Sequence, residues 1–156
     1  MLLFDKYRVL KINSIVKRRL RFWNLILILT VIASCLAFAV HYKNWTKVES
    51  DELKILSGFY YKKLRYSELD SVVMVDKIPP MQRLNGFSAL EKEKGLFREF
   101  KDSLTTKKVH VYADNLSNQK IKVVYNDSSK LYINFSDSLK TQELFTLLKG
   151  EIMVPD

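Results

Sequence analysis

The sequence of 156 residues has little of what catalytic and metal sites are built from, with one cysteine, two histidines and four glycines. One cysteine excludes a disulfide within the chain, and it is too few for a zinc site of the Cys2His2 type. Four dispersed glycines provide no glycine-rich loop for a phosphate. His41 and His110 are isolated, and we expect a solvated His110 on the outward face of a strand. We therefore expect no enzyme, no metal site and no cofactor.

Positive charge is concentrated at the start of the chain. Of the net charge of +9, residues 1–22 contribute +6, residues 23–40 carry no charged side chain, and residues 41–156 contribute +3. This distribution argues against a nucleic-acid-binding surface on the folded part of the chain. Outside the first 40 residues, the length allows one small domain of about 100 residues.

Residues 22–40 form an uncharged apolar run of nineteen residues. At a rise of about 1.5 Å per residue, such a helix matches the hydrocarbon thickness of a bilayer. The run has only four mildly polar members, Asn24, Thr30, Ser34 and Cys35. Trp23 at one end and Tyr42 with Trp45 at the other are typical of the aromatic belts of membrane proteins. The sequence predicts one transmembrane helix.

Basic residues gather on the N-terminal side of this run, namely Lys17, Arg18, Arg19 and Arg21. On its C-terminal side, acidic residues dilute the lysines. The positive-inside rule then predicts a cytoplasmic segment 1–21 and an extracytoplasmic domain. The four cations are expected to contact anionic lipid. Segment 1–21 is either an interfacial helix or a plain topology signal, and an inverted anchor is the rival orientation.

Two processing events are alternatives to an uncleaved helix. Ala37-Phe38-Ala39 resembles a signal-peptide cleavage site, and Ile32-Ala33-Ser34-Cys35 resembles a lipobox that would make the chain an envelope lipoprotein lipidated at Cys35. The apolar run is longer than that of an ordinary signal peptide, and it stays apolar after Cys35. We therefore expect the uncleaved anchor.

Period-two alternation dominates the chain after a polar connector, residues 41–51. We expect strands at residues 53–60, 61–65, 71–77, 95–100, 107–113, 121–125 and 131–135. Turn residues at 126–129 make the last two a hairpin. The pattern changes at Asp137 or Ser138, which can cap a helix that ends near Gly150. Residues 151–156 are a tail.

The expected fold class is mainly β with a C-terminal α-helix, plus one N-terminal transmembrane helix. About seven short strands cannot bury both faces of a flat sheet, so we expect a rolled antiparallel sheet that the C-terminal helix closes. The helix would pack through leucines that share one face, Leu144, Leu147 and Leu148.

Several short motifs resemble those of bacterial pleckstrin-homology-like (PH-like) domains. They are Gly58-Phe59-Tyr60, Leu64-Arg65-Tyr66-Ser67-Glu68-Leu69-Asp70-Ser71-Val72, Leu84-Asn85-Gly86-Phe87 and Gly95-Leu96-Phe97. The resemblance spans about residues 51–150, and we assign residues 52–150 to a domain of this kind. It implies a seven-stranded rolled sheet capped by a C-terminal helix. It implies no defined activity, because a shared fold does not transfer function.

Two functional hypotheses follow. Lys62, Lys63 and Arg65 occupy a position that resembles the phosphoinositide site of eukaryotic pleckstrin-homology domains, where cations hold phosphate by charge-assisted hydrogen bonds. A module for lipid, phosphate or a small ligand is therefore the alternative. Our main hypothesis is a non-catalytic interaction or scaffolding module at the bacterial cell envelope, with the lipid bilayer and another protein as partners. The aromatic residues 59–61 are either core or an exposed contact surface.

Overall fold

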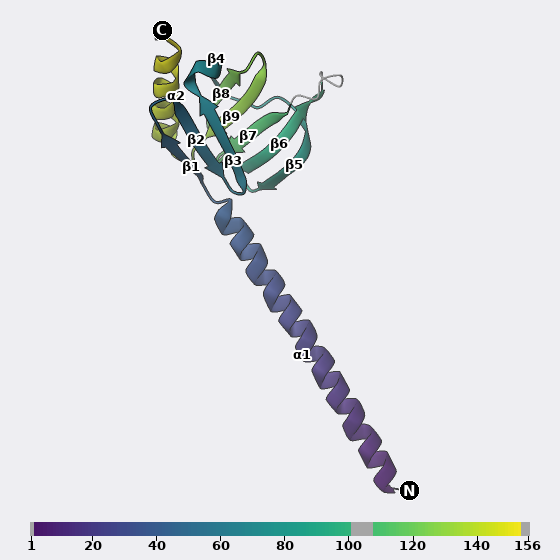
Figure 1. Ribbon diagram of the computed structural model, residues 1–156. Coiled ribbons are helices and arrows are strands. Elements are labelled where there is room, and N and C mark those ends of the chain that lie inside the picture. Colours follow the sequence, from purple (N-terminus) through teal and green to yellow (C-terminus); the bar gives the residue numbers. More distant parts are fainter. Residues whose placement is uncertain (1, 101–107, 154–156) are drawn as a thin grey trace. The chain divides into compact units, whose positions relative to one another are not determined.

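The computed structural model describes residues 2–100 and 108–153 (Figure 1). The chain divides into two compact units, residues 1–39 and residues 40–156. The described residues of the first unit belong to the long helix α1 (Leu2–Val40), and the second unit holds two β-sheets and the helix α2 (Ser138–Met153).

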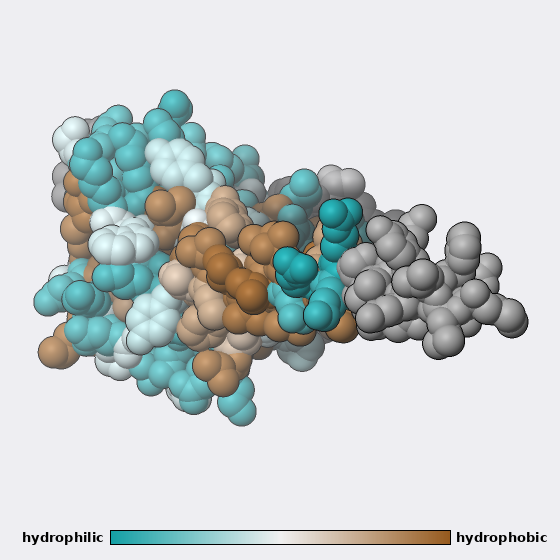
Figure 2. All heavy atoms as spheres, turned by 90° about the horizontal axis from the view of Figure 1, so that it is seen from below, coloured by the Kyte–Doolittle hydropathy of each residue, from teal (hydrophilic) through white to brown (hydrophobic). Residues whose placement is uncertain are grey.

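Helix α1 contains the segment Val16–Val40, which is long and apolar enough to cross a membrane. Figure 2 shows apolar side chains following one another along this segment, with hydrophilic ones toward its N-terminal end. The hydroxyls of Thr30 and Ser34 donate hydrogen bonds of 2.9 Å to backbone carbonyls four residues earlier. Their polar groups are thus satisfied within the helix, as a hydrocarbon environment requires. The helix begins at Leu2, so the expected segment 1–21 and the expected span form one continuous helix over the described residues.

A three-stranded antiparallel sheet opens the second unit. Its strands are β1 (Asn44–Val48), β2 (Glu52–Ser57) and β3 (Tyr60–Arg65), in the order β1-β2-β3. Gly58 and Phe59 form the turn between β2 and β3, and a short 3-10 helix η1 (Tyr66–Glu68) follows β3. Because β1 pairs only with β2, it is an edge strand.

The second sheet has six strands in the order β4-β8-β9-β7-β6-β5. They are β4 (Leu69–Val75), β5 (Met81–Ala89), β6 (Lys92–Glu99), β7 (Val109–Ala113), β8 (Lys120–Tyr125) and β9 (Ser129–Asn134). After β7 the chain crosses to β8 beside β4, and the β8–β9 hairpin brings β9 back between β8 and β7. Strands β7 and β9 therefore run parallel, whereas the other neighbours are antiparallel.

The expected fold class is confirmed at its coarse level, as mainly β with a C-terminal helix, and the finer details differ. The described residues form nine strands in two sheets, instead of about seven in one rolled sheet. Strands lie at all seven expected places, and β1 and β5 are additional. The expectation of an entirely antiparallel sheet is wrong at the β7–β9 pair. Strand β1 lies inside the segment 41–51, which we expected as a connector.

The core has two parts, one on each face of the six-stranded sheet. The main part joins both sheets to α2 through Leu53, Ile55, Leu64, Val72, Ile121, Val123, Leu131, Ile133, Leu144 and Leu148. The smaller part lies on the opposite face and contains Phe97, Val109, Val111, Ala113 and Tyr132, with Ile78 and Met81 packed against it. Alternate residues of β7 and β9 therefore face different cores, so neither face of these strands is left to solvent.

Helix α2 follows the expected pattern at its start and differs at its end. Asp137 caps it, because the backbone N–H of Leu139 donates to Asp137 Oδ1 at 2.9 Å. Leu144 and Leu148 are buried in the main core. The helix continues past Gly150 to Met153, since its last turn is held by tertiary packing that includes Ile152.

Candidate functional site

A groove of about 530 Å³ lies between the edge strand β1 and the first half of α2. Thr46 and Val48 of β1, Leu144 and Leu147 of α2, and Phe135 before α2 line its apolar part. We call it the β1–α2 groove. Its size falls within the range of ordinary ligand sites, about 300–1,000 Å³.

The outer edge of β1 borders this groove with unpaired backbone groups. The N–H of Asn44 points away from β2, because it donates to Asp114 Oδ2 at 2.8 Å, whereas the N–H of Glu49 points toward β2 and donates to Glu52 O at 3.0 Å. Backbone groups alternate in direction along an antiparallel strand, so those of Thr46 and Val48 point outward. Among the residues that the structure describes, these N–H and C=O groups have no hydrogen-bond partner.

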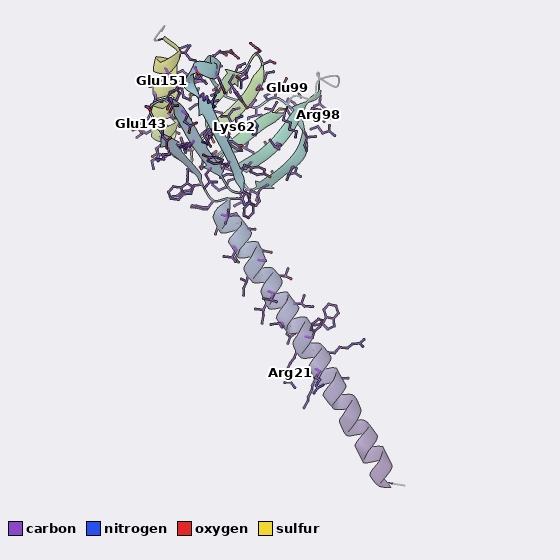
Figure 3. All side chains as sticks on the ribbon, in the orientation of Figure 1. Arg21, Lys62, Arg98, Glu99, Glu143 and Glu151 are labelled. Atoms are coloured by element: carbon purple, nitrogen blue, oxygen red, sulfur yellow. The ribbon has the colours of Figure 1, made fainter. Side chains whose placement is uncertain are left out.

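The rim of the groove carries side chains of both signs, Lys43, Lys140, Asp137 and Glu143. Figure 3 shows Glu143 on the exposed side of α2. A rim of mixed sign over an apolar floor is not suited to concentrating phosphate, which requires converging cations. It matches the mixed polarity of a polypeptide segment.

A buried polar network fixes the start of β1 against the larger sheet. The side-chain amide of Asn44 donates to the carbonyls of Tyr112 at 2.6 Å and Asn134 at 2.8 Å. Asp114, which accepts from the Asn44 N–H, also lies 2.8 Å from Lys94 Nζ, and the side chains of this ion pair are 0% and 1% exposed. Burial lowers the pKa of Lys94, and the carboxylate of Asp114 opposes that shift. The edge of β1 is therefore held in place before any ligand arrives.

The three predicted anion-binding residues all lie on β3, and strand alternation separates them. Lys62 is on the inner side of the strand, with Nζ 4.6 Å from the ring centroid of Tyr125 (Figure 3). Lys63 and Arg65 are on the outer side, where each forms an ion pair with a glutamate, at 3.4 and 3.7 Å. The structure thus brings Lys63 and Arg65 to one face and leaves Lys62 on the other.

The four predicted lipid-contacting cations lie on α1, at the N-terminal end of its apolar segment. Lys17, Arg18, Arg19 and Arg21 are all exposed. Figure 3 shows Arg21 projecting away from the helix. Their contact with anionic lipid stays a prediction.

Both histidines are less exposed than we expected. His110 is half-buried, with Nδ1 3.0 Å from Tyr112 Oη, and burial followed by the nearby Lys62 and Lys108 lowers its pKa to about 4. The expectation of a solvated His110 is wrong, because its side of β7 faces β3 rather than water. His41 is buried, and its ring stacks on that of Phe87 with centroids 4.4 Å apart. Over the described residues, no group of three or more His, Cys, Asp or Glu is placed to hold a metal ion.

Sequence reasoning missed the groove because it missed β1. The leucine spacing on α2 was visible in the sequence and identified one wall. The other wall consists of residues in the polar segment 41–51, where no alternation indicates a strand.

No family model, curated protein or solved structure matches this chain. The similarity to PH-like domains therefore stays a prediction.

Proposed function

We propose that this chain is a membrane-anchored, non-catalytic binding module that holds an extended segment of another protein in the β1–α2 groove. The observation that carries the proposal is an open strand edge beside an apolar groove of peptide size. An extended segment that pairs with Thr46 and Val48 gains main-chain hydrogen bonds from the edge. Its alternate side chains enter the space beside Leu144 and Leu147 and supply specificity.

The groove favours a polypeptide over the alternative phosphate or anionic lipid. Main-chain donors and acceptors occur together along β1, which matches another backbone and not an anion. The candidate anion ligands lie on two faces of β3, and two of them are already paired with glutamates. An anion would have to break those ion pairs before it gained any of its own.

The anchor in this proposal is α1, uncleaved and single-pass in a bacterial inner membrane. The apolar segment Val16–Val40 and its internally bonded hydroxyls support the span. The exposed cations at positions 17, 18, 19 and 21 support a cytoplasmic N-terminus. The groove would then face the extracytoplasmic side of the cell envelope.

A peptide library tests the proposal directly. Random peptides are panned against the full chain in lipid nanodiscs, and amide hydrogen exchange is measured with a selected peptide bound. We expect exchange to slow at Thr46 and Val48, whose N–H groups point outward, and to change little at Trp45 and Lys47, whose N–H groups already bond to β2. Failure to select a peptide, or binding that leaves exchange at Thr46 and Val48 unchanged, would contradict the proposal.

A pair of variants isolates the strand edge. Thr46→Pro removes the outward N–H, and an edge strand tolerates proline at such a position. We expect the selected peptide to bind about tenfold more weakly, since at least one main-chain hydrogen bond is lost. Thr46→Val keeps the N–H and the side-chain shape, so it should bind the peptide like the unmodified chain. Equal affinity for both variants would exclude strand pairing at β1.

A further inference from the structure

One end of the second unit carries exposed apolar side chains that lie next to one another. The register pairs Trp45 with Leu56 and Leu56 with Tyr61, so the three side chains form a row across the outer face of the three-stranded sheet. They are 58%, 46% and 57% exposed. Phe59, in the turn beside this row, is 74% exposed, and Tyr42, just before β1, is 59% exposed. We call these five residues the aromatic end. Figure 2 shows pale aromatic rings on the surface of the domain, among apolar and hydrophilic side chains.

The rest of this sheet face is charged. The next row across the strands consists of Lys47, Lys54 and Lys63, and each of these lysines forms an ion pair with Glu49 or Glu52. On this face of the sheet, apolar exposure is therefore confined to the end at which the chain arrives from α1. Single exposed apolar residues are ordinary, but a contiguous group at one end marks a contact surface.

Chain length limits what can cover this surface. Tyr42 and Trp45 follow Val40, the last residue of α1, by two and five residues. Five extended residues span at most about 18 Å, so these side chains stay close to the end of the apolar segment. In a membrane-anchored chain, the nearest surface to them is the head-group layer of the bilayer.

The composition of the aromatic end matches that layer. Tryptophan and tyrosine are enriched at membrane–water interfaces, because their rings are apolar and their N–H or O–H groups are polar. Lys43 Nζ lies 3.8 Å from the ring centroid of Trp45, so a cation accompanies the ring. A lysine at the bilayer surface is attracted to anionic head groups.

We propose that the aromatic end inserts into the interfacial region of the lipid bilayer. The proposal rests on anchoring by α1. Tyr42, Lys43 and Trp45 also line the β1–α2 groove, whereas Leu56, Phe59 and Tyr61 do not, so lipid contact is tested at the residues outside the groove. Lipid, held close to the aromatic end by the anchor, is present at high effective concentration, which no protein partner in solution shares.

Quenching of tryptophan fluorescence by brominated lipid tests the contact in the full chain, with one chain in each nanodisc. Trp23→Phe with Trp45→Tyr removes both native tryptophans. In that background, Tyr61→Trp places a reporter on β3, which is separated from β1 by β2. Ser67→Trp is the matched control, because Ser67 is exposed in η1 at the opposite end of β3. The chain with Trp45→Tyr alone keeps Trp23 as a reporter of the anchor.

We expect brominated lipid to lower the emission of the Tyr61→Trp chain and to leave the Ser67→Trp chain unchanged. Adding Leu56→Glu should restore the emission of the Tyr61→Trp chain, because a carboxylate at this exposed position opposes insertion. Quenching of Trp23 without quenching of the Tyr61→Trp chain would overturn the inference and leave the anchor intact. That result would indicate that a protein surface, and not lipid, contacts the aromatic end. Absence of quenching at Trp23 would overturn both the anchor and the inference.

Discussion

His110 is held in its uncharged form by its surroundings. Burial is the main cause of its low pKa of about 4, and the cations of Lys62 and Lys108 add to it. The uncharged ring forms a hydrogen bond between Nδ1 and Tyr112 Oη, at 3.0 Å, whose direction depends on the tautomer of the ring. In the unfolded chain the pKa returns to about 6.5. Between pH 6.5 and pH 4 the unfolded chain thus binds more protons, so the free energy of unfolding rises with pH and falls on acidification.

We predict that His110→Gln removes this part of the acid sensitivity. The glutamine amide can either accept a hydrogen bond from Tyr112 or donate one to it, and it does not titrate. Urea unfolding of the full chain in mild detergent, repeated from pH 7 to pH 4, measures the effect. The free energy of unfolding should fall more steeply in the unmodified chain than in the variant over that range.

The carboxylate of Glu49 titrates in a separate pH range. Hydrogen bonds from Lys54 and Lys47 lower the pKa of Glu49 to about 2, so its contribution is complete above the ordinary value of 4.5 and is lost only below it. A parallel fall in both chains between pH 6.5 and pH 4.5 would show that another group is responsible.

The turn between β2 and β3 depends on one glycine. Gly58 has a φ of +62°, and a Cβ there would stand 2.3 Å from Cδ2 of His41. We predict that Gly58→Ala lowers the free energy of unfolding by about 1–2 kcal/mol from the left-handed backbone alone, and further by displacing the His41 ring from Phe87. Urea unfolding monitored by near-ultraviolet circular dichroism measures it.

Gly150→Ala is the matched control within α2. Nothing lies within 4 Å of the position its Cβ would take, and alanine favours a helix. This variant should be about 0.5–1 kcal/mol more stable than the unmodified chain. If both alanine variants shifted stability in the same direction, the special role of Gly58 would be refuted.

The same elements show how far sequence alone could predict the fold. Strands β7, β8 and β9 follow clear alternation, and all three were predicted. Strand β1 was missed because its side chains do not follow the usual pattern of buried apolar and exposed polar residues. Asn44 is buried in a polar network, and Trp45 is exposed. Strand β5 was missed because a register shift between Arg83 and Asn85 interrupts its alternation.

The candidate site was predictable only in part, for the same physical reason. Leucine spacing on α2 identifies one wall of the groove, and Leu144 and Leu147 do line it. The opposite wall is an unpaired strand edge, which is a property of sheet order and leaves no mark on composition. The separation of the basic residues of β3, in contrast, could have been predicted from the sequence. Side chains alternate between the two faces of a strand, so Lys62 and Lys63 of the predicted strand must face opposite sides.

At the scale of the whole molecule, two kinds of exposed surface follow one another along the chain. In our proposal, the apolar surface of α1 contacts lipid and the groove of the second unit binds a polypeptide. Neither surface needs catalysis to act. A module of this kind localises a partner at a membrane, and its effect depends on which side of that membrane carries the groove.

Orientation is therefore the prediction on which the cellular role depends. We predict that a reporter enzyme active only outside the cytoplasm is active when fused after Asp156, and that a reporter active only in the cytoplasm is inactive at the same position. The physical reason is the cost of moving the cations at positions 17, 18, 19 and 21 across the membrane.

Replacing Lys17, Arg18, Arg19 and Arg21 together by glutamine tests that reason. The lysines that follow the span, Lys43, Lys47 and Lys54, would then be the main nearby cations, and the fraction of chains with an inverted anchor should rise. The matched control replaces Lys6, Arg8 and Lys11, which lie farther from the apolar run, and should change orientation less. Cytoplasmic reporter activity in the unmodified chain would place the groove among cytoplasmic proteins, and the search for its polypeptide partner would move there.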